Sequence, residues 1–363
     1  MAINSKYFTA FASNENIGSD FTKKVYEYFG DIESAWNAKI SDLHRIEGLT
    51  EHKINNFLQT REKTTPDNEA EKLADSGISI ITYEDDCYPE LLRQISDPPM
   101  SLFYQGNKDL FNAKYNVAVV GSRKCSATGK AVLTKIISEF KNTDLCITSG
   151  LALGIDETAH QAALDNGLST IAVLGSGLKN IYPSKNKKLY RDIIENNGLV
   201  ISEYPIFAEP ASYHFPQRNR IVSGMCPCTL VAEAALKSGA LITARLCLEQ
   251  NRELMCIPGA ISNPATEGIY KLLKEGAGIV TDGEDILNIM CWQLNKIEKK
   301  EEQLSNLSKE EEIVFSALKQ DSMNLDELAI KTGLQVDDLM IILTRLEIED
   351  FILQTEGGTY SAI

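Results

Sequence analysis

The chain has 363 residues, of which 43% are hydrophobic and 24% are charged, with 23 glycines and 11 prolines. This composition is typical of globular proteins, and the length suffices for two to four domains of roughly 100–200 residues each. No window approaches about 18 consecutive apolar residues, which excludes a transmembrane helix. The first residues also lack the apolar stretch of a signal peptide. We therefore expect a cytoplasmic protein that does not contact a membrane.

The net charge of −15 would repel nucleic acid if it were evenly spread, but it is concentrated at one end. Residues 301–363 hold 14 acidic and 4 basic residues. Residues 117–138, in contrast, contain four basic residues and no acidic one. An acidic chain can still present a basic pocket, because the local field decides what binds there.

Residues 1–65 show apolar residues at helical spacing, which predicts a small helical domain. Gly48 separates two of the helical stretches, as in a helix-hairpin-helix. The hairpin amides of such a motif can hold a DNA phosphate. Here, however, Thr50 stands where a second glycine is usual, and Glu47 and Glu51 would repel a phosphate. We therefore favour a domain that serves packing.

The middle of the chain alternates strand and helix signals. Residues 66–114 indicate a small α/β lead-in, and short apolar runs separated by helical stretches follow from Asn116 onward. Such runs are typical of a parallel sheet that is buried on both faces. We predict an α/β protein with a Rossmann-like, doubly wound core over residues 66–292. The runs are VAVV (117–120), LCITS (145–149), STIAVLG (169–175), GLVISEY (198–204), PCTLVAEA (227–234), ELMCIPG (253–259) and GIVTD (278–282).

The last part of the chain changes character again. Residues 293–307 are polar and charged, which predicts a linker. Residues 308–363 contain three helical stretches and a hairpin that turns at Gly357 and Gly358. Three helices and a two-stranded wing predict a C-terminal winged helix.

Candidate binding residues follow the predicted strands, since ligands of parallel sheets bind beyond the carboxyl ends of the strands. Gly121, Ser122 and Arg123 follow the first run, and the segment from Gly150 to Gly154 follows the second. Glycines let a phosphate approach the backbone, and arginine can bind it through two hydrogen bonds. No loop has the complete dinucleotide fingerprint or P-loop sequence. We therefore expect a phosphate-lined groove and no nucleotide cofactor.

The segment 213–221 is the most unusual of the chain. Phe215 can stack on a base, Arg218 and Arg220 can hold phosphates, and Asn219 can read a base edge. The alternative is that Phe215 packs in the core while the two arginines form surface ion pairs. Further along the chain, Lys237 is followed by the small residues Ser238 and Gly239, where another predicted helix begins.

Signals of catalysis or of a metal site are weak. None of the eight cysteines forms a CxxC pair and no His-rich motif is present, which favours reduced thiols and no metal. Glu233 could be a general base, but we favour a buttress for Arg218 or Arg220. Asp156 and His160 lie four residues apart, on one helical face, where a structural hydrogen bond is favoured over a catalytic pair.

Several segments over about residues 70–290 together form a specific set. They are GSRKCSATGK, ITSGLALGIDETAHQAAL, AVLGSGLKNIYPSKNKKLY, ISEYP and IPGAISNPATEGIYKLLKEGA, and above all FPQRNRI with KSGALITA. Taken together, these segments resemble the DNA-processing protein A (DprA/Smf) family. An N-terminal helical domain (sterile-alpha-like or helix-hairpin-helix) and a C-terminal winged helix also occur in that family.

The resemblance implies a protein without enzymatic activity that binds single-stranded DNA. Family members protect incoming DNA during natural transformation, load a RecA-type recombinase and form homodimers through the Rossmann-like core. By motif match, the DNA-binding side chains would be Arg123, Phe215, Arg218, Asn219, Arg220 and Lys237. Small groups and backbone amides would come from Ser149, Gly150, Gly154, Ser238 and Gly239, beside Gly121 and Ser122.

Two points stay open beside this resemblance. The expected recognition helix of the winged helix carries Asp337 and Asp338 against Arg345 alone, so we predict that it contacts protein rather than DNA. An alternative function is that of a nucleotide phosphoribohydrolase-like enzyme of the lysine-decarboxylase-like family, with Glu233 as the candidate catalytic residue. A dinucleotide-dependent oxidoreductase is disfavoured by the incomplete fingerprints.

Overall fold

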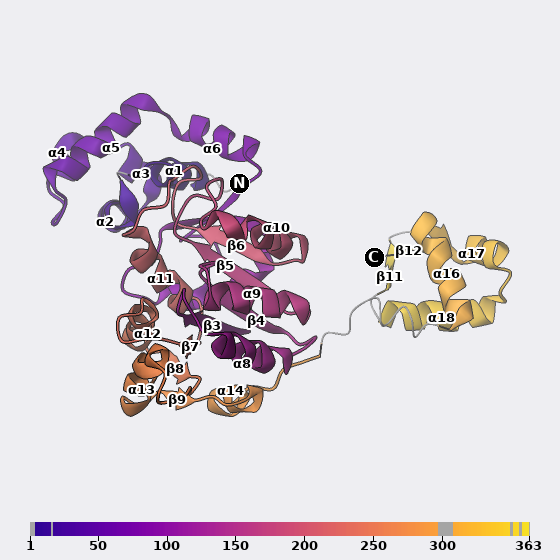
Figure 1. Ribbon diagram of the computed structural model, residues 1–363. Coiled ribbons are helices and arrows are strands. Elements are labelled where there is room, and N and C mark those ends of the chain that lie inside the picture. The colour runs from indigo at the N-terminus through magenta and orange to yellow at the C-terminus, as the bar shows by residue number, and fades with distance from the viewer. Residues whose placement is uncertain (1–3, 16, 297–307, 349–350, 356–357, 363) are drawn as a thin grey trace. The chain divides into compact units, whose positions relative to one another are not determined.

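The computed structural model describes residues 4–15, 17–296, 308–348, 351–355 and 358–362 (Figure 1). The chain forms two compact units, Met1–Lys296 and Ile297–Ile363. The predicted linker lies mostly outside the described residues, and the finer division of the first unit into a helical domain and a core stays a prediction.

A nine-stranded sheet forms the centre of the first unit. The seven neighbouring strands β6, β5, β4, β3, β7, β8 and β9 pair in parallel. At one edge of the sheet, β2 pairs antiparallel with β6, and β1 pairs antiparallel with β2. Each predicted apolar run contributes a strand, so the predicted α/β fold is confirmed. In spatial order the strands are β1 (Ser79–Thr82), β2 (Ser101–Gly106), β6 (Leu199–Ser202), β5 (Ser169–Leu174), β4 (Leu145–Ser149), β3 (Tyr115–Gly121), β7 (Cys228–Glu233), β8 (Glu253–Cys256) and β9 (Gly278–Ile279).

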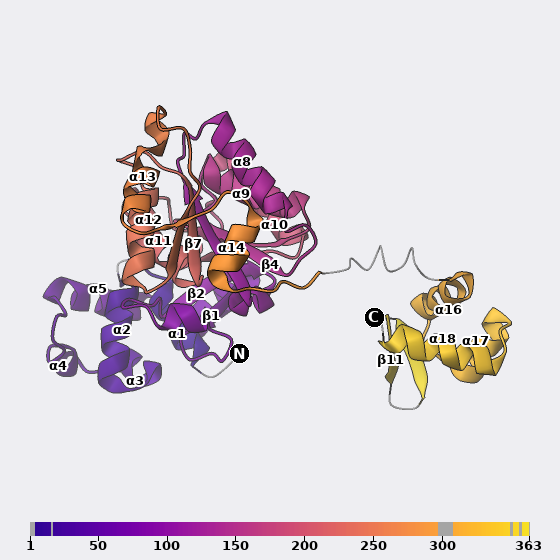
Figure 2. The same cartoon turned by 90° about the horizontal axis from the view of Figure 1, so that it is seen from below.

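Helices cover both faces of this sheet (Figures 1 and 2). Val117 and Val119 of β3 pack into one apolar cluster, whereas Ala118 and Val120 pack into the other. Successive side chains of a strand point to opposite faces, so a strand buried on both faces must be apolar throughout. One face carries α8 (Ala127–Ser138), α9 (Ile155–Asp165), α10 (Lys187–Glu195) and α14 (Gly283–Met290); the other carries α11 (His214–Gly224), α12 (Ala240–Glu249) and α13 (Glu267–Lys274).

The order of the strands creates a switch point in the sheet. The chain proceeds outward from β3 through β4, β5 and β6, and then returns to β7 on the other side of β3. The crossovers that follow β3 and β7 therefore leave in opposite directions. In open parallel sheets, this divergence opens a crevice at the carboxyl ends of the two strands, and ligands bind there.

The N-terminal helices pack around an aromatic core. The rings of Phe11 and Phe57 stack with centroids 5.2 Å apart, and Trp36 meets Phe11 edge-on at 5.3 Å. Gly48 turns the chain before α5 at a positive φ of 77°, and Thr50 caps α5. The helices are α1 (Ser5–Ala12), α2 (Gly18–Phe29), α3 (Ile32–Trp36), α4 (Ile40–Leu43), α5 (Glu51–Lys63) and α6 (Pro66–Asp75), followed later by α7 (Glu90–Arg93).

The second unit is a winged helix, as predicted. Three helices pack on a small antiparallel sheet in the order β10-β12-β11. Its elements are α16 (Lys309–Gln320), β10 (Met323–Asn324), α17 (Leu325–Thr332), α18 (Val336–Ile348), β11 (Ile352–Thr355) and β12 (Thr359–Ala362). None of the helices among the described residues is long and apolar enough to cross a membrane.

A buried histidine ties α9 to the sheet. His160 is fully buried, and its Nδ1 lies 2.7 Å from the hydroxyl of Thr170 on β5. That hydroxyl donates to the carbonyl of Ile147 at 2.7 Å, so it accepts from His160, which carries its proton on Nδ1. Burial lowers the pKa of His160 to about 3, which keeps the ring neutral in the fold.

We expect this histidine to make the fold sensitive to acid. In the unfolded chain His160 gains a proton below about pH 6.5, whereas in the fold it stays neutral down to about pH 3. Stability is therefore lost as the pH falls through this window, by at most about 1.4 kcal/mol per pH unit. Urea denaturation between about pH 7 and about pH 5 measures how the free energy of unfolding changes with pH. The variant His160→Gln should show a smaller change than wild type. The exposed control His52→Gln should not, and equal slopes for all three proteins would contradict the prediction.

Candidate nucleic-acid interface

A groove of about 840 Å³ opens at the carboxyl edge of the sheet, beside the switch point between β3 and β7. The loops after β3, β4, β5, β6 and β7 line it together with the starts of α9, α11 and α12. The structure brings most of the predicted site residues to this groove. They are Gly121, Ser122, Arg123, Phe215, Arg218, Asn219, Lys237, Ser238 and Gly239, while Gly150 lines a small cavity that adjoins it.

An exposed arginine lies on an aromatic pair in the groove. The guanidinium carbon of Arg123 is 5.0 Å from the ring centroid of Phe215, and Tyr182 lies on the same ring with centroids 5.5 Å apart. The ring face attracts the cation and holds it near the groove. Arg123 forms no ion pair with any residue that the structure describes. The groove thus offers a cation beside two partly exposed aromatic rings.

Arg218, in contrast, is a buried structural arm. It is 3% exposed, and its Nη1 donates to the carbonyl of Gly150 at 2.6 Å and to that of Val173. A Cβ on Gly150 would lie 2.4 Å from Nη2, so a larger residue there would displace the guanidinium. Burial lowers the pKa of Arg218 to about 10 and raises that of nearby Asp156 to about 6. Arg218 therefore ties α11 to the ends of β4 and β5.

Two further predicted residues support the loops rather than face the groove. Ser149 is fully buried, and its hydroxyl donates to the carbonyl of Val119 at 2.7 Å. Gly154 has a positive φ of 87°, and a Cβ there would lie 2.4 Å from the carbonyl oxygen of Ser122. Both residues hold the loops after β3 and β4 together.

The loop after β7 forms the opposite wall of the groove. Lys237 is exposed there, and the hydroxyl of Ser238 accepts the amide of Ala240 at 3.2 Å. The next two amides of α12 are bound as well, that of Leu241 to the carbonyl of Ser238 at 3.1 Å and that of Ile242 to the carbonyl of Gly239 at 3.0 Å. On α11, Asn219 lines the groove and accepts from Nε of Arg218 at 3.2 Å. This wall therefore offers one exposed cation, Lys237, while the amides of the first turn of α12 are already bound.

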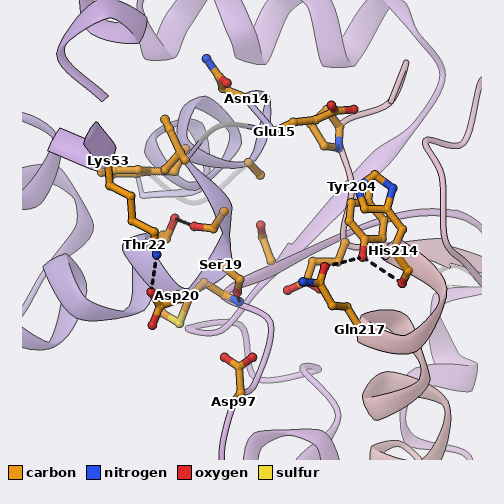
Figure 3. A pocket seen from close by; sticks show the side chains of 18 of the residues that line it. Asn14, Glu15, Ser19, Asp20, Thr22, Lys53, Asp97, Tyr204, His214 and Gln217 are labelled. Carbon is orange, nitrogen blue, oxygen red and sulfur yellow. Dashed lines mark hydrogen bonds and ion pairs between the residues drawn. The ribbon is translucent and has the colours of Figure 1, made fainter. Parts of the chain in front are cut away.

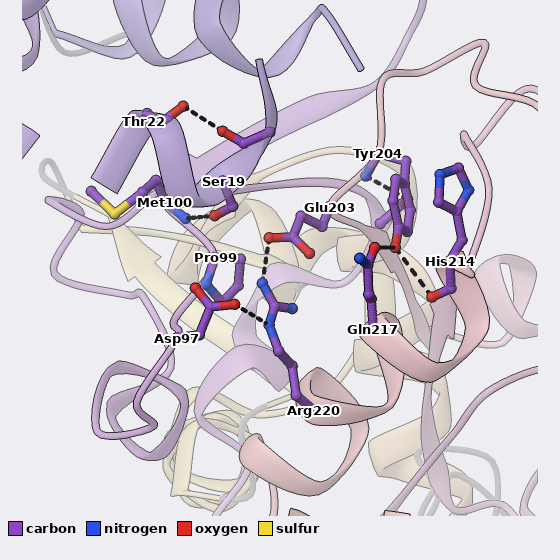
Figure 4. A network of polar contacts seen from close by, with 12 residues as sticks. Ser19, Thr22, Asp97, Pro99, Met100, Glu203, Tyr204, His214, Gln217 and Arg220 are labelled. Atoms are coloured by element: carbon purple, nitrogen blue, oxygen red, sulfur yellow. Dashed lines mark hydrogen bonds and ion pairs between the residues drawn. The ribbon is translucent and has the colours of Figure 1, made fainter. Parts of the chain in front are cut away.

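Arg220 is not brought to the groove (Figure 4). Residues two apart on a helix point to nearly opposite sides, so Arg220 leaves α11 away from Arg218. Its Nη2 lies 2.6 Å from Glu203, and its Nε lies 3.2 Å from Asp97. The side chain is 12% exposed. The pKa of Arg220 is raised despite the opposing effect of its burial, because these two carboxylates stabilise the charge.

Arg220 lies instead at a second hollow, of about 390 Å³, between the N-terminal helices and α11 (Figure 3). We call it the acidic pocket, because four carboxylates and only two cations line it. Both cations are paired: Lys53 lies 2.6 Å from Asp20, and Arg220 binds two of the other acids. The lining acids are Glu15, Asp20, Asp97 and Glu203.

Glu233 buttresses a helix, but not the predicted arginines. It is 2% exposed, and its carboxylate accepts the amide of Ser126 at 2.9 Å and the hydroxyl of Ser126 at 2.5 Å. That hydroxyl in turn caps α8 by accepting the amide of Gly129 at 3.0 Å. The predicted partners were wrong because β7 ends beside the loop after β3, away from the polar groups of α11.

The favoured hydrogen bond between Asp156 and His160 is also absent from the described residues. Asp156 accepts the amides of Gly150 at 3.2 Å and Ala152 at 3.4 Å, while His160 binds Thr170. Each side chain thus has a closer partner in the loop or sheet beneath it. No cluster of three or more potential metal ligands occurs among the described residues.

Tyr182 and Lys124 line the groove but were not among the predicted site residues. Tyr182 is 45% exposed and enlarges the aromatic surface of Phe215. Its signal in the sequence is its position after Gly175 and Gly177, which follow the third apolar run at the same edge of the sheet. Spacing alone did not show that this tyrosine, eight residues beyond the end of β5, returns to Phe215.

We predict that Arg220 stabilises the fold. Arg220→Met leaves the carboxylate of Glu203, whose side chain is 13% exposed, without its partner. Loss of one partner from a buried ion pair costs about 3 kcal/mol of the free energy of unfolding, which urea denaturation would measure. Arg123→Met, at the exposed arginine, should change the same quantity by less than about 0.5 kcal/mol. Equal effects of the two variants would contradict this assignment.

Two models of known protein families together match most of the chain. The model described as DNA recombination-mediator protein A matches residues 79–291, and that of the DprA winged helix domain matches residues 298–358. DNA processing protein DprA of Streptococcus pneumoniae is 49% identical over 203 residues, which are 56% of this chain and 71% of that protein. Protein Smf of Escherichia coli is 34% identical over 334 residues, 89% of this chain and 88% of that protein.

Two solved structures are similar as well. The X-ray structure of DprA from Streptococcus pneumoniae has a TM-score of 0.67 at 39% identity and covers 78% of this chain and 95% of that one. DNA processing protein A from Helicobacter pylori, whose structure concerns a unique single-stranded DNA binding mode, has a TM-score of 0.53 at 29% identity. It covers 59% of this chain and 96% of that one. The chain described here belongs to the DNA recombination-mediator protein A (DprA/Smf) family.

Proposed function

We propose that the chain is a recombination mediator that binds single-stranded DNA in the groove at the carboxyl edge of the sheet. The observation that carries this proposal is Arg123 on the ring of Phe215, with Tyr182 on the same ring. A cation beside exposed aromatic rings suits a strand whose phosphates bind the charge while its bases stack. The Helicobacter pylori relative, described by its single-stranded DNA binding mode, supports the same ligand.

The groove is suited to bind DNA without reading its sequence. Contacts with phosphates fix the position of a strand but carry no information on base identity, and stacking accepts every base. Lys237, exposed on the opposite wall, adds a phosphate contact of this kind. Arg218 contributes by holding the loop at Gly150 in place and by its nearby positive charge.

Membership of the family supports the finer parts of the proposal. We infer that the chain protects incoming single strands during natural transformation and loads a RecA-type recombinase on them. It acts in the cytoplasm, as a homodimer formed through the Rossmann-like core, and it catalyses no reaction. Single-strand binding in the groove is the step on which these further roles depend.

The nucleotide phosphoribohydrolase alternative is not favoured. Its candidate general base, Glu233, accepts hydrogen bonds from the amide and the hydroxyl of Ser126. A base must reach the proton that it abstracts from the substrate, and this carboxylate is buried at the start of α8. Its position supports a structural role.

The winged helix is proposed to contact protein rather than DNA. The first turn of α18 carries Asp337 and Asp338, and the basic residue of its last turn, Arg345, lies 3.0 Å from Glu311 of α16. A helix that enters the major groove needs free cations, since the phosphates on both sides are negative. This pairing and these acids support a protein partner.

We predict that Arg123→Ala weakens the binding of oligothymidine about tenfold, since one hydrogen bond to a charged group contributes about 1.5 kcal/mol. Fluorescence anisotropy across a salt series would also show the slope of log K against log salt falling by about 0.7, as expected for one lost phosphate contact. Lys141→Ala, which follows α8 at the opposite edge of the sheet, should change neither value. Wild-type protein that binds no oligothymidine at low salt would contradict the proposed function and direct attention to nucleotide hydrolysis.

A further inference from the structure

A third hollow, of about 430 Å³, lies among α8, α9 and α10. Three lysines line it: Lys130 in the first turn of α8, Lys188 in the first turn of α10, and Lys185 just before α10. All three are exposed, and none forms an ion pair in the part of the chain that the structure describes. We call these three residues the lysine row.

The lysine row lies next to the groove, because the segment that carries Lys185 directly follows the groove residue Tyr182. Tyr182 ends the aromatic surface of the groove, and the short helical turn Ser184–Asn186 follows two residues later. The side-chain Nδ2 of Asn186 donates to the carbonyls of Leu151 at 3.0 Å and Ala152 at 3.5 Å. Because Ala152 lines the groove, Lys185 is held directly beside the groove wall.

The charges of this hollow are ordered along its length. α8 links the parallel strands β3 and β4, and α10 links β5 and β6, so both helices begin at the carboxyl edge of the sheet. Lys130 and Lys188 in their first turns therefore lie at the end near the groove. Asp165 and Asp192 come later in α9 and α10, at the far end. Glu157, the remaining lining acid, is directed to a backbone amide at the start of α9. The end near the groove is therefore the positive one.

The other side of the groove would repel a phosphate backbone. The loop after β6 leads from the groove wall at Ser212 to Tyr213 and the acidic pocket (Figure 3). There the cations Lys53 and Arg220 are already bound by carboxylates. A polyanion that leaves the groove gains nothing on this side, and meets unpaired cations on the other.

We propose that a bound single strand leaves the groove past Tyr182 and continues over the lysine row, which binds phosphates of nucleotides outside the groove. This inference rests on the proposed function, because it requires that the groove itself holds single-stranded DNA. It adds a second contact surface and a direction to the bound strand. The row acts only on strands long enough to reach it.

The length of the strand provides the test. The double variant Lys185→Ala with Lys188→Ala is compared with Lys108→Ala with Lys141→Ala, which removes the same charge from exposed sites outside the groove and the row. Anisotropy is measured with oligothymidines of about 6 and about 20 nucleotides, chosen to fill the groove alone or to extend beyond it. For the long strand, the row variant should bind several-fold more weakly, with a salt slope lower by about 1.4, as expected for two lost phosphate contacts. For the short strand, the affinity and the salt slope of the row variant should equal those of wild type.

Three other results would overturn the inference. If the row variant binds both strands like wild type, the strand does not reach the lysine row. If it loses affinity equally for both strands, these lysines belong to the groove and not to an extension of it. If the control variant loses as much as the row variant on the long strand, the effect reflects net charge alone. Normal binding of the short strand by wild type separates all three from failure of the proposed function.

Discussion

The groove depends on a guanidinium buried inside the protein. Arg218 reaches from α11 under the loop after β4 and binds the carbonyls of Gly150 and Val173. Burying a charge is costly unless hydrogen bonds compensate it, and these carbonyls, with Asp156 nearby, provide the compensation. The same arm fixes the start of α11, and therefore the ring of Phe215 on which Arg123 lies.

Other charged residues around the groove also support its walls. Arg220 joins α11 to the loop after β6 through Glu203 and to the segment before β2 through Asp97. Glu233 fixes the start of α8 and with it the loop that carries Arg123. Loops that are already fixed lose little conformational freedom when DNA binds, so a few contacts suffice for tight binding of a strand. Buried charge thus preorganises the groove, and the exposed cations remain for the ligand.

The sheet and the location of the groove were predictable, whereas the partners of individual side chains were not. Apolar runs such as that around Val119 must form buried strands, and their carboxyl ends then share one edge. Arg218 and Arg220 look equivalent in the sequence, but the start of α11 at His214 turns them to different sides. The partner of Glu233 follows from the pairing of β7 with β3, which links residues over a hundred positions apart. Tyr182 likewise reaches Phe215 only through the path of its loop.

The most direct test of the account is where a bound strand touches the protein. Photo-crosslinking of an iodouracil-substituted oligothymidine to the full chain, read out by mass spectrometry of the peptides, reports aromatic side chains that stack on bases. The account predicts adducts on Phe215 and Tyr182, at the carboxyl edge of the sheet. Adducts confined to α18 of the winged helix or to the turn at Gly48, with none at the groove, would contradict it.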